Sequence, residues 1–148
     1  MRSSHFLVAL ALAATACGGA EEANDQATEA AVEPTPAASV TIVEPADGAV
    51  LDAGPVRVAF EVEGLEIVPA GTMDPGTGHH HVIVNDDVDW TVPIPADPGV
   101  HIHMGQAQTE TVLENLPPGE HRLIAVVADG VHIPLDPPVA DTVTITIR

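Results

Sequence analysis

Residues 55–63 have the sequence PVRVAFEVE, and this stretch decides the fold class. Its larger apolar side chains fall on alternate positions: Val56, Val58, Phe60 and Val62. A period of two is typical of a β-strand with one buried face. Residues 120–128, EHRLIAVVA, are apolar on both faces, as expected of a strand in the centre of a sheet. Because no helical period competes with these patterns, the sequence predicts an all-β protein.

Further strand patterns lie on both sides of this stretch, with turn sequences between them. The additional predicted strands are residues 39–44, 79–85, 109–116 and 142–147. Residues 45–48 (PADG) and 117–119 (PPG) are turn sequences. About seven short strands in about 110 residues favour an immunoglobulin-like β-sandwich. His121 stands in the corner before the sixth strand, where such domains often carry a tyrosine, so a structural role is expected for it.

The first residues are typical of an export signal. Arg2 precedes an apolar run at residues 6–14, and small residues follow before Cys17. The run is shorter than the roughly 20 residues that span a bilayer, so we expect a cleaved signal peptide at residues 1–16. The residues before Cys17 resemble the bacterial lipobox, which implies lipidation of Cys17 and a membrane anchor. The alternative is a plain signal peptide and an incidental cysteine, although Cys17 is the only cysteine in the chain.

Residues 17–38 are small, acidic and proline-containing, with five acidic side chains and no basic one. Such a composition buries too little apolar surface to offset the entropy of ordering, so a disordered tether is expected. The sequence therefore divides into a signal peptide (1–16), a lipidated acidic tether (17–38) and a β-sandwich domain (39–148).

The charge of the chain limits its partners. There are 22 acidic and 4 basic residues, and the net charge is −18. Nucleic acid is excluded as a partner because its phosphates would be repelled. The same charge disfavours an electrostatic grip on anionic lipid and favours attraction of cations. Export and lipidation predict the extracytoplasmic side of the cell envelope (outer membrane or periplasm in a Gram-negative cell), with an envelope protein as a further candidate partner. Nothing in the sequence defines an oligomeric state.

Histidine carries the candidate chemistry, since seven of the eight histidines lie in the predicted domain. His79 and His81 are two apart on a predicted strand and share one face, and His101 and His103 would do the same in an extended segment. Imidazole is a good ligand for copper and zinc. We therefore expect these four residues to bind a divalent transition metal, copper or zinc, with Asp86, Asp87 or Glu110 as outer hydrogen-bond partners. Affinity is expected to fall as the pH drops through about 6.5.

Each of the other candidates has a simpler interpretation. His80 alternates with valines and fits a buried polar position, and His132 fits a residue that braces a loop. Met104 is a soft copper ligand or, more simply, a packing residue. The pair at 101 and 103, next to glycines, is also compatible with solvated loop histidines.

Three segments resemble a known family: GTGHHHVIVND (76–86), HIHMGQAQTET (101–111), and LPPGEH (116–121) with HIPLDPPV (132–139). Together they are similar to an uncharacterised family of small bacterial exported domains, classed as a domain of unknown function. The resemblance covers roughly residues 71–147. That family often has a second histidine in its last motif, where this chain has Leu135, so a ligand is lost here if that histidine binds metal. The resemblance implies no activity.

Three function classes remain open. The first is metal binding for buffering or delivery of copper or zinc, and the second is a structural or interaction module of the envelope without metal. An enzyme is disfavoured, because Ser39 is the only serine after the signal and lies in no nucleophile-elbow motif. No glycine-rich phosphate loop is present either. Water activation by a histidine-bound metal, with Glu110 or Asp74 as base, stays as the enzymatic alternative.

Overall fold

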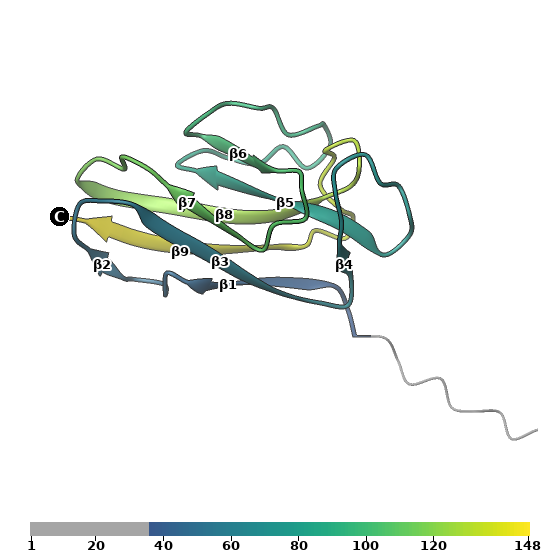
Figure 1. Ribbon diagram of the computed structural model, residues 1–148, viewed down its shortest axis with the longest axis horizontal. Coiled ribbons are helices and arrows are strands. Elements are labelled where there is room, and N and C mark those ends of the chain that lie inside the picture. Colours follow the sequence, from purple (N-terminus) through teal and green to yellow (C-terminus); the bar gives the residue numbers. More distant parts are fainter. Residues whose placement is uncertain (1–35) are drawn as a thin grey trace, which may run out of the picture. The chain divides into compact units, whose positions relative to one another are not determined.

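Nine β-strands account for the regular structure of residues 36–148, the part of the chain that this computed structural model describes (Figure 1). They are β1 (Ser39–Glu44), β2 (Val50–Leu51), β3 (Val56–Glu63), β4 (Glu66–Ile67), β5 (Thr77–Val84), β6 (His101–Met104), β7 (Glu110–Leu113), β8 (Gly119–Ala128) and β9 (Ala140–Ile147). No helix occurs in this range, so none there is long and apolar enough to cross a membrane. The all-β prediction is confirmed. The predicted signal peptide, Cys17 and the tether up to residue 35 lie outside the described residues.

The strands form two sheets. One has three strands in the order β1-β3-β7, and the other has six in the order β2-β9-β8-β5-β4, with β6 also paired to β5. All pairs are antiparallel except β2 with β9 and β4 with β5. The long strand β8 pairs with β5 and with β9, which fits its apolar residues on both faces. The sandwich is thus built from two unequal sheets, and its immunoglobulin-like assignment stays a prediction.

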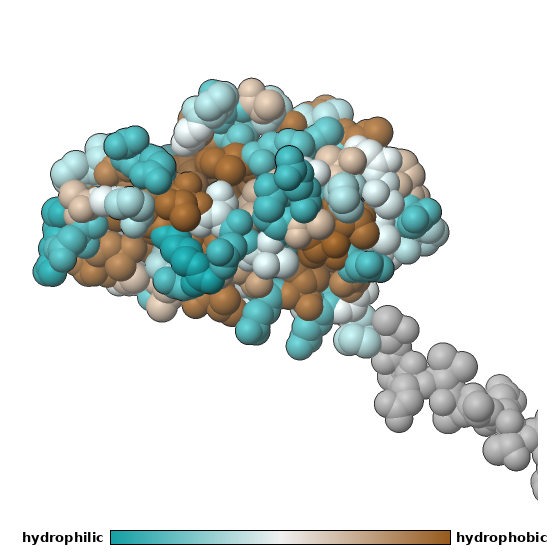
Figure 2. All heavy atoms as spheres, viewed as in Figure 1, coloured by the Kyte–Doolittle hydropathy of each residue, from teal (hydrophilic) through white to brown (hydrophobic). Residues whose placement is uncertain are grey.

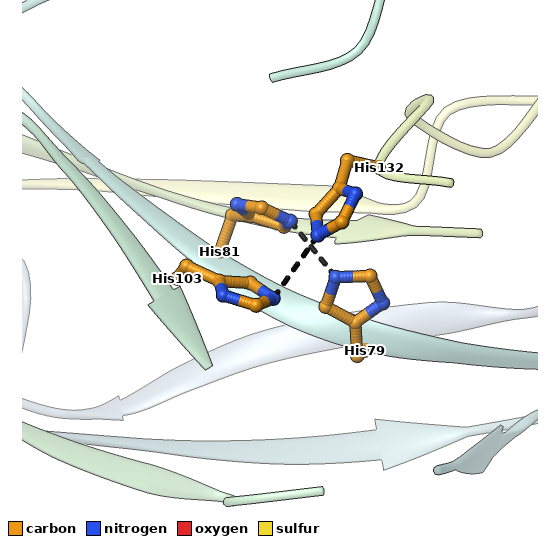
Figure 3. Close-up of side chains that lie close together, drawn as sticks. All are labelled: His79, His81, His103 and His132. Carbon is orange, nitrogen blue, oxygen red and sulfur yellow. Dashed lines mark hydrogen bonds between the residues drawn. The ribbon is translucent and has the colours of Figure 1, made fainter. Parts of the chain in front are cut away.

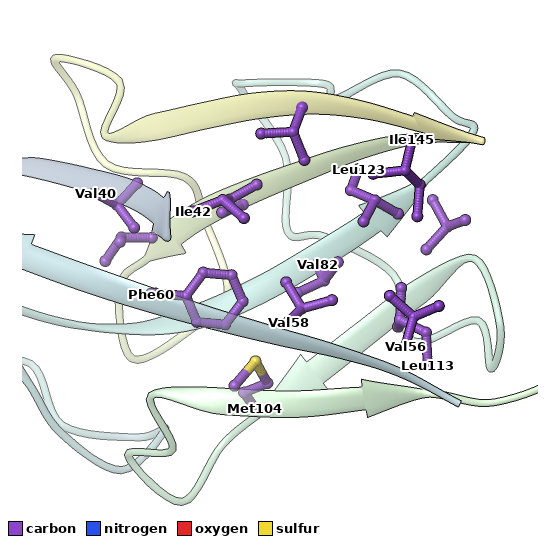
Figure 4. Close-up of a cluster of buried hydrophobic side chains, with 14 of the residues drawn as sticks. Val40, Ile42, Val56, Val58, Phe60, Val82, Met104, Leu113, Leu123 and Ile145 are labelled. Carbon is purple, nitrogen blue, oxygen red and sulfur yellow. The ribbon is translucent and has the colours of Figure 1, made fainter. Parts of the chain in front are cut away.

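Aliphatic side chains fill the space between the two sheets (Figure 4). Those with no solvent exposure at all include Val58, Val82, Leu123 and Ile145. Phe60 of β3 adds an aromatic ring, which stacks on the imidazole of His80 with the ring centroids 4.8 Å apart. Complete burial of such an aliphatic side chain contributes about 1.5–3 kcal/mol, so this core is the main source of stability.

The alternation of β5 places its histidines on opposite faces of the larger sheet. His80 points into the core between the sheets, where it meets Phe60. His79 and His81 point to the outer face together with Ile83, which belongs to a second apolar cluster. That cluster consists of Ile83, Ile94, Ile124, Val126 and Ala128. The loop that contains Ile94 covers this face, so the outward side chains of β5 are also buried.

His121 has the structural role that its place in the corner predicts. Its Nε2 lies 2.8 Å from the carbonyl oxygen of Pro117, and its Nδ1 lies 2.9 Å from Nδ2 of Asn85. With the proton on Nε2, the ring donates to Pro117 and accepts from Asn85, so both nitrogens are satisfied. The imidazole therefore ties the start of β8 to the turn before it and to the end of β5.

The surface shows no single dominant apolar area in the view of Figure 2. Hydrophobic residues form separate brown areas on that face, with hydrophilic residues between them. The larger exposed hydrophobic side chains of the described residues are Val43, Val50, Met73, Trp90, Val92, Val112 and Val131. Scattered exposure of this kind is ordinary for a globular domain, so the histidines are the better guide to function.

Candidate metal centre

Two of the predicted ligands come from β5. His79 and His81 are two residues apart on this strand, so both side chains leave the same face of the sheet. Each is only 1 % exposed. Their Nε2 atoms are 3.0 Å apart, close enough for one ring to donate a hydrogen bond to the other. The strand therefore holds two imidazoles side by side before any metal is bound.

The third predicted ligand comes from β6, which the sequence did not identify as a strand. In the antiparallel pairing of β5 with β6, His103 lies directly opposite His81. The two ring centroids are 5.1 Å apart. The exposed His103 thus closes the solvent side of the pair on β5.

The prediction for His101 needs a correction, because the structure does not bring this residue into the cluster. It shares a strand face with His103 but lies opposite Ile83, about 7 Å further along the strand. Its Nε2 is 3.2 Å from a carboxylate oxygen of Asp86 instead. The register of β6 therefore places His103 in the cluster and leaves His101 outside it.

His132 takes the fourth position, although a loop brace was its simpler interpretation from the sequence. The Asp129 carboxylate accepts hydrogen bonds of 2.9 Å from the backbone N–H groups of Val131 and Ile133. The N–H of His132 donates to the Asp129 carbonyl at 3.0 Å, and the backbone of His132 has the uncommon φ of 72°. A positive φ at a non-glycine residue is held only where surrounding bonds fix it. Residue spacing does not encode such a loop conformation, so the spacing of the histidines gave no signal for it.

The four imidazoles converge on one point (Figure 3). One ring nitrogen from each of His79, His81, His103 and His132 lies within 4.8 Å of the other three. Nε2 of His132 is 3.2 Å from Nε2 of His103, matching the 3.0 Å pair on β5. Four nitrogens about 2.0–2.1 Å from a tetrahedral metal would be about 3.3 Å apart, so both pairs are already close to the spacing that a metal requires.

Burial keeps the inner ligands neutral. Desolvation, reinforced by the neighbouring histidines, lowers the pKa of His79 to about 4 and that of His81 to about 3. Desolvation followed by the charge of His132 also lowers the pKa of His103. A metal ligand must be an unprotonated nitrogen, so these lowered pKa values favour metal binding over proton binding.

Gly105 makes room for the ring of His103. A Cβ atom at this position would lie 2.3 Å from Cε1 and 2.5 Å from Nε2 of that imidazole. The backbone carbonyl of Gly105 accepts a hydrogen bond of 3.1 Å from Ala70, which fixes the chain beside the cluster. The glycine two residues after His103 is therefore a steric requirement of the cluster.

The remaining expected participants lie elsewhere. Met104 is buried in the core between the sheets, so it is a packing residue. Asp86 contacts His101, and Glu110 pairs with Arg57. The acid that acts on the cluster is Asp129, whose charge opposes the lowering of the pKa of His79.

Comparison with known proteins places these residues in a family. A family model described as a domain of unknown function, DUF4399, matches residues 58–148. This chain belongs to the DUF4399 family. The matched segment contains all four clustered histidines and the glycine beside them, and the predicted membership of a family of unknown function is confirmed.

No curated protein matches the chain. Among solved structures, the crystal structure of an engineered protein is similar at 16 % identity and a TM-score of 0.43. The match covers 76 % of this chain and 20 % of the engineered protein, so the chain spans about a fifth of that protein's length. The DUF4399 family has no assigned activity, and the site itself must supply the argument for function.

Proposed function

We propose that this DUF4399 domain binds one divalent transition-metal ion, copper or zinc, through His79, His81, His103 and His132. The observation that carries the proposal is the convergence of four ring nitrogens within 4.8 Å. Two of these imidazoles are buried and have lowered pKa values, so the cluster presents neutral nitrogen ligands at physiological pH. Four imidazoles form a suitable donor set for either metal.

The chemistry of the donor set favours a divalent ion over Cu(I). Soft sulfur ligands select Cu(I), and the methionine nearest in sequence, Met104, is turned into the core. The negative charge of the chain raises the local concentration of cations. Together these features support a Cu(II) or Zn(II) site.

The position of the site supports exchange of the ion rather than permanent burial. His103 is exposed and His132 is partly exposed, while the other two ligands are buried. An ion held at this surface can leave by losing its two outer ligands without disturbing β5. Buffering or delivery of metal is therefore the role we propose for the domain.

The proposed setting is the cell envelope. It is supported by the signal-like residues 1–16 and by Cys17, a suitable lipid acceptor. A lipid on Cys17 would hold the domain on the extracytoplasmic side of a membrane, with an envelope protein as a candidate recipient of the ion.

Metal analysis of the full chain, purified without a histidine tag, tests this function. We expect one Cu(II) or Zn(II) per chain, and loss of uptake when His79 and His81 are both replaced by alanine. His132→Ala should weaken binding by about 10-fold or more, whereas the matched variant His101→Ala should leave it unchanged. His121→Ala should lower stability and leave uptake unchanged.

Absence of metal uptake would support a different function. If the chain takes up no stoichiometric metal, the contact between His132 and His103 serves to hold a loop against β6. The domain is then a structural or interaction module of the envelope, and the metal proposal is wrong.

A further inference from the structure

A small hollow opens beside the histidine cluster. It has a volume of about 230 Å³ and is bordered by His81, His103 and His132 together with residues 93–96. His79 does not border it. Three of the four clustered histidines thus border one shared space.

The rest of the wall is apolar. Residues 93–96 have the sequence PIPA, which carries no polar side chain. The backbone N–H of Ile94 already donates a hydrogen bond of 2.9 Å to the carbonyl oxygen of His132. The hollow therefore offers van der Waals contact and, apart from the imidazoles, no side-chain hydrogen bond to an occupant.

The wall is fixed in place relative to the cluster. The bond from Ile94 to His132 joins the two loops directly, and the Ile94 side chain is buried against the outer face of the larger sheet. Asp129 in turn fixes the loop of His132. A binding hollow that is held in this way exists before its ligand arrives.

We propose that the bound metal accepts one further ligand from this hollow, and that this ligand is a small neutral molecule. The inference rests on the metal-binding function proposed above. The hollow borders three ligands and not His79, so the incoming molecule reaches the metal through the triangle of those three rings, opposite His79. The metal then changes from four to five ligands, as zinc does in catalytic sites.

The charge and polarity around the hollow select a neutral ligand. An anion buried against the apolar wall would lose its hydration without gaining hydrogen bonds from side chains. The net charge of −18 repels anions, and the Asp129 carboxylate adds negative charge near His79. The positive charge of the metal ion attracts an anion, and these two penalties oppose that attraction. A small neutral molecule with one donor atom meets neither penalty.

A titration of the Cu(II)-loaded full chain with pyridine and, separately, with azide tests the inference. Pyridine is neutral at pH 8 and azide is an anion, and both bind copper. Visible absorption and electron paramagnetic resonance report the ligands of Cu(II). We expect a saturable change with one pyridine per copper, no loss of copper from the protein, and affinity for azide lower by about 10-fold or more.

Two substitutions of alanine by phenylalanine distinguish binding in the hollow from binding elsewhere on the surface. Ala96→Phe fills the hollow and should abolish the pyridine response, with copper stoichiometry and the spectrum before titration unchanged. Ala53→Phe changes an exposed alanine that does not border the hollow, and should leave the response unchanged.

The possible failures are distinguishable. A chain that takes up neither copper nor zinc contradicts both the proposed function and this inference. A chain that binds one copper but shows no response to pyridine, or responds equally in Ala96→Phe, contradicts the inference alone. Equal affinity for azide and pyridine contradicts the selection of a neutral ligand.

Discussion

His80 lies beside the metal ligands in sequence but belongs to the core. It has no solvent exposure, and neither ring nitrogen has a hydrogen-bond partner. Desolvation, followed by the charge of His79, lowers its pKa to about 4. A neutral imidazole still carries one N–H group, and burying such a group without a partner costs about 1–3 kcal/mol. At this position, therefore, the histidine destabilises the domain.

Replacing His80 with leucine should remove that cost. We expect His80→Leu to raise the free energy of unfolding by about 1–3 kcal/mol at pH 7, measured by urea denaturation. The matched variant His121→Leu removes a ring whose two nitrogens are both bonded, so it should lower the free energy of unfolding. A loss of stability in His80→Leu would show that its ring is satisfied in solution.

At the scale of the strand, the period of two accounts for what the sequence predicted well. The alternation in β3 and the apolar length of β8 identified both strands, and the spacing of His79 and His81 put them on one face. These features depend on local geometry alone, which residue spacing encodes. The all-β fold followed from it, as did two of the three clustered histidines that the sequence predicted.

The positions of the other two clustered histidines, His103 and His132, depend on tertiary geometry. Strand β6 has only four residues and lies between loops, so its pattern was too short to identify. Its register with β5 decides that His103, and not His101, faces His81. His132 reaches the cluster from a loop that Asp129 shapes through hydrogen bonds. Neither register nor loop conformation is visible in residue spacing.

Gly105 connects β6 to the metal centre and offers a test at the element scale. Gly105→Ala adds a methyl group where the His103 ring now lies, so the ring must move away from the other ligands. We expect metal affinity to fall by about 10–100-fold, measured by competition with a chelator. In a His103→Ala background the methyl meets no ring, and the same change should have no further effect on affinity. An equal loss in both backgrounds would contradict the steric account.

For the whole molecule, the buried histidines predict how stability depends on pH. The unfolded chain binds a proton at each histidine near pH 6.5, whereas the pKa values of His79, His80 and His81 in the folded metal-free protein are about 4, 4 and 3. Between these values the unfolded state binds more protons, so stability is complete above pH 6.5 and falls as the pH drops towards 4. Protons therefore compete with the metal for the buried ligands at a lower pH than the value of about 6.5 expected from the sequence alone.

Urea denaturation of the metal-free full chain at several pH values measures this dependence. The free energy of unfolding should fall by up to about 1.4 kcal/mol per pH unit for each of these histidines between pH 6 and 4.5. The slope should be smaller in His80→Leu. A free energy that stays constant over this range would contradict the lowered pKa values.

The proposed envelope setting concerns the whole chain, and a substitution of Cys17 tests it. We expect Cys17→Ser to release the protein from the membrane fraction, or to block its processing, because serine cannot accept the thioether-linked lipid. Membrane fractionation and labelling with palmitate provide the measurement. If the variant stays in the membrane and labels as before, Cys17 does not anchor the chain.

The central claim is that four imidazoles share one metal, and X-ray absorption of the metal-loaded full chain tests it most directly. We predict four imidazole nitrogens at about 2.0–2.1 Å from the bound Cu(II) or Zn(II), four also in His101→Ala, and three in His132→Ala. A first shell of oxygen atoms with two or fewer imidazoles, or a shell that loses an imidazole in His101→Ala and none in His132→Ala, would contradict the site.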